Sequence, residues 1–215
     1  MRRTILTLVV SLVAALAFAA PQAKAPKPAS KAPATKKAGM SAQAKIRQAM
    51  SAAPADVAKD ATIMDWPDTP NGEMKQLRAG TNGWTCMPST PSEFGAASGA
   101  DPMCLDKSFM DWAGAWMAKK DPQVKSVGIG YMLRGDKGES NTDPFATGPT
   151  ADNQWIVTPP HMMVVVPDPA QLEGMPTDPH NGGPWVMWKG TKYAHVMAPI
   201  APMTTAKAAK PAAKP

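Results

Sequence analysis

Apolar side chains recur at helical spacing in the segment that ends near Lys120. An acidic residue that could cap the helix, Asp101 or Asp106, stands before this segment, and Asp121-Pro122 follows it. The apolar positions that share one face of the predicted helix are Leu105, Phe109, Trp112, Ala113, Trp116 and Met117. We therefore predict an amphipathic helix whose apolar face packs on another element.

Alternating and compact apolar runs predict strands elsewhere. Val127, Ile129, Tyr131 and Leu133 alternate along one strand, and the glycines between them leave room for close packing. Further strands are expected at 61–66, 73–78, 84–87, 161–166, 184–188 and 192–198, with a first helix at 44–59 that Pro54 divides. This order of elements predicts an α+β fold with a mainly antiparallel sheet and one or two packed helices.

The N-terminal residues predict a signal peptide over 1–19. Arg2 and Arg3 precede an apolar run, 5–20, and Ala17-Phe18-Ala19 forms a small-x-small cleavage site. An uncleaved anchor helix is the alternative, but the run is short for a membrane span. The prediction is a periplasmic or secreted protein with no transmembrane span after cleavage.

Basic, proline-rich tails flank the expected folded domain, which runs over 41–203. The chain has 215 residues and a net charge of +6, yet residues 1–47 and 206–215 contain no acidic residue, so the domain between them is acidic. The linker 20–40 and the tail 204–215 are expected to be disordered spacers. Their lysines could alternatively contact polyanions weakly, but without interleaved aromatic residues they predict no sequence-specific nucleic-acid binding.

Cys86 and Cys104 are the two cysteines of the chain. Export through an oxidising compartment and an even cysteine count favour a structural disulfide between them. Because Met87 and Met103 flank the cysteines, a redox or metal-binding pair is the alternative.

Three strings of residues resemble segments of a group of uncharacterised exported bacterial proteins. They are LRAGTNGWTCMP at 77–88, PMCLD at 102–106 and DPHNGGPWVMWKGT at 178–191. The similarity extends over about 51–202. It implies export and one compact domain, and it supplies no activity and no site residues.

The three histidines are the candidate ligand or polar residues. His161 and Met163 share one face of an expected strand, as do Tyr193, His195 and Met197, and His180 lies in a turn with Asp178. A His/Met copper site is possible if the two strand faces meet, and it would need at least three such side chains to converge. Core packing is the expectation for the methionines and hydrogen bonding for the histidines, so no metal or cofactor is predicted.

Catalytic motifs are lacking, since the sequence contains no Gly-x-Ser-x-Gly, His-Glu-x-x-His or P-loop pattern. Two hypotheses follow. The favoured one is a non-enzymatic envelope protein that binds a small ligand, an envelope component or a protein partner. The alternative is a small envelope hydrolase or metal-binding protein that uses His161, His180 or His195. Convergence of two histidines with an acidic or sulfur side chain would favour the alternative.

Overall fold

The computed structural model of the chain describes residues 40–69, 72–91 and 102–203. The helical elements among these residues are α1 (Ala42–Met50), α2 (Ala55–Ala58), α3 (Lys107–Met117) and the 3-10 helix η2 (Pro169–Leu172). The strands are β1 (Thr62–Asp65), β2 (Lys75–Arg78), β3 (Thr85–Met87), β4 (Met103–Leu105), β5 (Gly128–Met132), β6 (Glu139–Ser140), β7 (Trp155–Ile156), β8 (His161–Val165), β9 (Trp185–Met187) and β10 (His195–Pro199). The expected signal peptide, the tail 204–215 and all of the linker except Met40 lie outside the described residues, so those expectations stay predictions.

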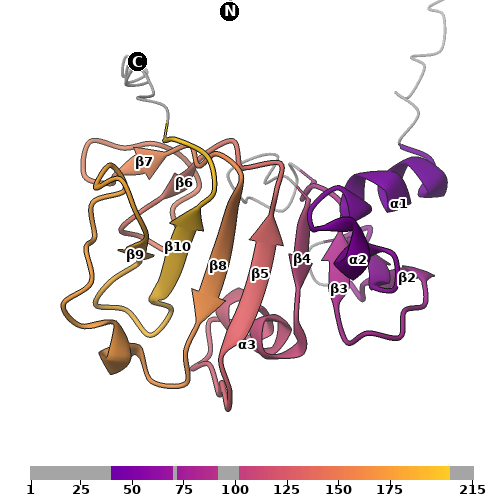
Figure 1. Cartoon of the computed structure of the whole chain (residues 1–215), viewed down its shortest axis with the longest axis horizontal. Helices are drawn as coiled ribbons and strands as arrows, with labels where there is room; N and C mark the ends of the chain where they lie inside the picture. The colour runs from indigo at the N-terminus through magenta and orange to yellow at the C-terminus, as the bar shows by residue number, and fades with distance from the viewer. Residues whose placement is uncertain (1–39, 70–71, 92–101, 204–215) are drawn as a thin grey trace, which may run out of the picture. The chain divides into compact units, whose positions relative to one another are not determined.

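Eight of these strands form one sheet in the order β2-β1-β3-β4-β5-β8-β10-β9. Figure 1 shows the part of this order that runs from β3 through β4, β5 and β8 to β10. Within this sheet β1 and β3 are parallel, and the other neighbouring strands are antiparallel. Strands β6 and β7 form a separate antiparallel pair. The α+β class with a mainly antiparallel sheet is therefore confirmed.

Helices α1 and α3 pack on opposite faces of the sheet. Alternation along β3 and β4 sends Cys86 and Cys104 to the face that α1 covers, whereas Met87 and Leu105 lie on the face that α3 covers. Glycine allows α3 to come close, because a Cβ at Gly128 would lie only 2.6 Å from the Phe109 backbone nitrogen. The close packing expected at the strand glycines is thus confirmed.

Asp106 starts α3 and also fastens it to the sheet. Its Oδ1 accepts a hydrogen bond from Phe109 N at 2.8 Å, which caps the first turn. Its Oδ2 accepts from Ile129 N on β5 at 2.7 Å. One carboxylate therefore fixes where the helix begins and how it is placed against β5.

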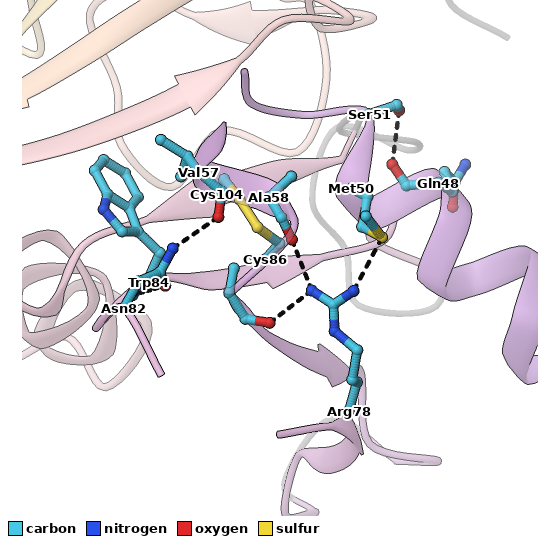
Figure 2. The surroundings of a disulfide bond; sticks show 11 residues. Gln48, Met50, Ser51, Val57, Ala58, Arg78, Asn82, Trp84, Cys86 and Cys104 are labelled. Atoms are coloured by element: carbon cyan, nitrogen blue, oxygen red, sulfur yellow. Dashed lines mark hydrogen bonds between the residues drawn. A yellow bond between two sulfur atoms is a disulfide. The ribbon is translucent and has the colours of Figure 1, made fainter. Parts of the chain in front are cut away.

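Cys86 and Cys104 form a disulfide between β3 and β4, where they are directly paired in register. Both residues are fully buried in a cluster with alanines of the α1 region and Ile63. Figure 2 shows the Arg78 guanidinium in the surroundings of this disulfide, where it donates to the carbonyl oxygens of Ala58 and Ala61 at 2.6 and 2.8 Å. The predicted disulfide between these two cysteines is confirmed.

Several short elements were not predicted from the sequence. Strand β4 has three residues, and β6 lies in a loop that shows no periodicity, as does η2. The first helix is divided near Pro54, as expected, into α1 and α2. None of the helices in the described ranges is long and apolar enough to cross a bilayer.

Candidate functional site

A cavity of about 460 Å³ lies on the sheet face that α3 covers. Its walls come from α3, from strands β3, β4, β5, β8, β9 and β10, and from the segment 144–147. Nine methionines line it: Met74, Met87, Met103, Met110, Met117, Met132, Met163, Met187 and Met197. Clefts and cavities that bind small molecules have volumes of about 300–1,000 Å³, so a cavity of this size is a candidate binding site.

The register of the sheet brings the methionines and the two strand histidines together. On β8 and β5, His161 is the direct partner of Met132. On β8 and β10, Met163 is the direct partner of Met197. Residues that are two apart on a strand share a face, so His161 and Met163 both face the cavity and His161 lies diagonally across from Met197.

His161 is 0 % exposed and has an uncommon hydrogen-bonding state. Its Nδ1 lies 2.8 Å from the Pro159 carbonyl oxygen, a geometry in which Nδ1–H donates and the lone pair resides on Nε2. Nε2 is buried and has no hydrogen-bond partner in the described structure. Burial lowers the pKa of this imidazole to about 4, although the hydrogen bond with the Pro159 carbonyl raises it. His161 is thus a neutral imidazole whose buried acceptor nitrogen has no hydrogen-bond partner in the described structure.

His195 lines the same cavity inside a ring of aromatic side chains. Its Nδ1 lies 3.0 Å from the Tyr193 carbonyl oxygen. Its ring centroid is 4.9 Å from that of Trp188 and 5.1 Å from that of Trp112, both in edge-on arrangements. Burial lowers its pKa to about 4, and His161 lowers it further while the Tyr193 carbonyl opposes the shift. His195 is therefore neutral and held rigidly.

Three indole rings form one side of the cavity. Trp112 stacks on Trp188 at an interplanar angle of 12°, and Trp116 stacks on both. Trp188 has a φ of +57°, a conformation that bulky residues seldom adopt. Its Nε1 donates to the Ser140 carbonyl at 2.7 Å, and its backbone N–H donates to the Asn141 carbonyl. Several contacts therefore hold this ring in place against local backbone strain.

Two carboxylates lie where the β6 segment meets the cavity. Asp136 Oδ1 accepts hydrogen bonds from Gly138 N and Thr158 N at 3.1 and 2.9 Å. Burial raises the pKa of the Glu139 carboxyl to about 8, and the Asp136 charge raises it as well. Glu139 is consequently largely protonated at neutral pH and can donate a hydrogen bond.

Replacing Glu139 by Gln is expected to remove part of the pH dependence of stability. Between the ordinary pKa of 4.5 and the folded value of about 8, the folded protein holds this proton more tightly than the unfolded chain does. The free energy of unfolding therefore falls as the pH rises through this window, and the loss is complete above the folded pKa. Because Glu139 is partly exposed, we expect a loss of about 2 kcal/mol.

The measurement is urea denaturation of the native protein and Glu139→Gln at about pH 5 and about pH 8. The difference in the free energy of unfolding between the two proteins should change by about 2 kcal/mol between these two pH values. Glu173→Gln is the control, because the Glu173 side chain is 75 % exposed. Equal pH dependence in the native protein and Glu139→Gln would contradict the expectation.

The structure separates the candidate residues that the sequence suggested. His161 and His195 line the cavity, whereas His180 and Asp178 lie in an exposed turn with 3.6 Å between Nδ1 and Oδ1. Tyr193 packs edge-on against Trp112 and donates from its hydroxyl to the Lys120 carbonyl at 3.1 Å. His180 and Asp178 therefore do not join the two strand histidines.

Most residues of the cavity wall were not predicted from the sequence. Glu139, Asp136 and the stacked indoles Trp112, Trp116 and Trp188 were not suggested as site residues. A weak signal existed in the number of methionines, 16 in the whole chain, and of tryptophans, seven. Both residue types are also ordinary core components, so their number alone did not locate a site.

Comparison of the chain with protein-family models, with curated proteins and with solved structures finds no match. Within the described ranges, no group of three or more His, Cys, Asp and Glu side chains is placed to hold a metal ion. The geometry of the cavity is therefore the basis on which a function is proposed.

Proposed function

We propose that the chain is an exported, non-enzymatic protein whose folded domain binds a small ligand in the methionine-lined cavity. The observation that carries this proposal is the cavity itself, which has a volume of about 460 Å³ and walls of thioether and indole groups. Binding sites for small molecules are typically largely apolar with few polar groups, and here the polar side chains include two imidazoles, two carboxyls and the Lys119 ammonium. The buried disulfide is compatible with an oxidising compartment.

A hydrolase is less well supported by the same geometry. A histidine that acts as a general base must reach the hydroxyl or thiol that it activates. In the part of the chain that the structure describes, Nδ1 of each buried histidine pairs with a backbone carbonyl, and neither ring is hydrogen-bonded to a Ser, Thr or Cys side chain. The convergence of two histidines with sulfur side chains instead favours the metal-binding form of the alternative hypothesis.

Binding of a neutral, apolar fluorescent probe, N-phenyl-1-naphthylamine, tests whether the cavity accepts a ligand. The full chain is expected to bind the probe saturably, with a rise in probe fluorescence. Ala113 lies on the cavity wall of α3, so Ala113→Phe should fill part of the space and weaken binding by roughly tenfold.

The matched control is Gly114→Ala on the same helix. A Cβ at Gly114 meets no atom within 4 Å, and Gly114 does not line the cavity, so this variant should bind the probe as the native protein does. Near-ultraviolet circular dichroism checks that each variant keeps its packing. Probe binding that is absent, or equal in Ala113→Phe and the native protein, would contradict the proposal.

A further inference from the structure

We propose that the cavity binds one Cu(I) ion through Nε2 of His161 and the thioether sulfurs of Met132, Met163 and Met197. This inference rests on the proposed function, because it names the ligand class of the same cavity. His161 lies between these methionines on the sheet: Met132 is its direct cross-strand partner, Met163 follows it on the same face, and Met197 is its diagonal neighbour. Direct and diagonal neighbours on a sheet face lie about 5 and 7–8 Å apart, within the reach of long side chains.

His161 has the hydrogen-bonding arrangement of a metal ligand. Histidines that bind a metal through one ring nitrogen usually donate the other N–H to a carboxylate, a backbone carbonyl or a water. The Nδ1 contact with the Pro159 carbonyl fills that role at 2.8 Å. His161 is one of the residues around the cavity, and its Nε2 acceptor is fully buried and without a hydrogen-bond partner in the described structure. Buried polar atoms without partners are rare, so we expect the lone pair on Nε2 to bind a ligand.

The donor set favours a soft, singly charged ion. Thioether sulfur is a soft ligand that suits Cu(I), whereas Mg²⁺ and Ca²⁺ require oxygen donors. Structural zinc sites use thiolates and several histidines. Both cysteines are instead joined in the disulfide, on the opposite face of the sheet. Thioether and imidazole donors without thiolate therefore point to Cu(I).

Core packing alone does not account for this arrangement. Methionine is a common filler of irregular cores, and Met132, Met163 and Met197 are buried, but core packing leaves the Nε2 acceptor of His161 without a hydrogen-bond partner in the described structure. The expectation of no metal assumed core packing for the methionines and hydrogen bonding for the histidines. Strand register instead brings one histidine and three methionines to one patch of the sheet.

The test is a Cu(I) titration of the full chain, with the disulfide intact and without oxygen. A chromophoric bicinchoninate chelator competes for the ion, and ascorbate keeps copper reduced. A thiol assay confirms that no free cysteine contributes. We expect one Cu(I) per chain, and X-ray absorption of the complex should show sulfur and nitrogen neighbours around copper.

Substitutions identify the ligands. Met132→Leu and Met163→Leu conserve volume and should keep the fold, yet each should weaken Cu(I) binding by roughly tenfold or more. His161→Gln should weaken it as well. Met162→Leu is the matched control, because Met162 lies on the same strand between His161 and Met163 but on the opposite face. Its affinity for Cu(I) should equal that of the native protein.

Three outcomes would overturn the proposal: no Cu(I) uptake, uptake that neither Met132→Leu nor Met163→Leu weakens, or an equal loss in Met162→Leu. The naphthylamine titration separates these failures from failure of the proposed function. If the native protein binds the probe but not Cu(I), the cavity accepts a ligand and the metal assignment is wrong.

Discussion

Removing the Cys86–Cys104 disulfide is expected to lower the free energy of unfolding by about 3 kcal/mol. The two cysteines are 18 positions apart and join β3 to β4, so the cross-link restricts the unfolded chain over a loop of that length. Both side chains are fully buried, and their replacement also leaves space in the cluster beneath α1. Urea denaturation of the double variant Cys86→Ala/Cys104→Ala measures the effect.

The native protein unfolded in the presence of a reductant is the control for this experiment. It should lose most of the same stability without any substitution, since the loop constraint is then absent from the unfolded state. Coincident denaturation curves for the oxidised native protein and the double variant would show that the disulfide adds nothing to stability.

The second large effect is expected for Asp106→Ala, which should destabilise the protein by about 3 kcal/mol. The substitution removes the cap of α3 and leaves Ile129 N on β5 without its carboxylate partner. A cap contributes about 1 kcal/mol, and the part-buried hydrogen bond from Ile129 N to the charged carboxylate contributes about 2 kcal/mol more. Because α3 carries Trp112 and forms one wall of the cavity, the variant should also bind the naphthylamine probe less well.

Two further variants separate these contributions. Asp106→Asn keeps an oxygen that can accept one of the two hydrogen bonds, so it should lose less stability than Asp106→Ala. Asp111→Ala removes an exposed carboxylate of the same helix, whose ion pair with Lys107 lies at the surface, and should change stability by less than about 0.5 kcal/mol. Equal losses in Asp106→Ala and Asp111→Ala would contradict the dual role of Asp106.

Several helices and strands could be predicted from the sequence because each depends on residues that are close together along the chain. The apolar spacing around Phe109 and Trp112 gives α3, and Pro54 divides the first helix as its missing N–H requires. The final hairpin, β9 and β10, follows from two apolar runs around Gly190, which has a φ of +82°.

Strand order and register could not be predicted, and the site depends on both. Residue alternation indicates that His161 and Met163 share a face, but it does not indicate that β5 lies on one side of β8 and β10 on the other. The convergence of Met132 and Met197 with His161 comes from those two neighbours. Strands as short as β4 and β6 carry too little periodicity to be recognised.

The sequence could not distinguish among the three candidate histidines for a similar reason, because their burial depends on the fold. Sequence position placed His161, His180 and His195 on equal terms, since each stands near a polar or sulfur side chain. The fold distinguishes the three histidines, because His180 lies in a solvent-exposed turn whereas the other two lie at buried positions on strands. Glu139 was not suggested because only its burial and the nearby Asp136 alter its pKa.

A crystal structure of the full chain grown with the naphthylamine probe shows whether the space beneath α3 holds a ligand. We expect probe density between Trp112 of α3 and the sheet face that carries His161 and Met163. Methionine side chains that fill this space, with the probe absent from it, would show that the cavity is not a binding site.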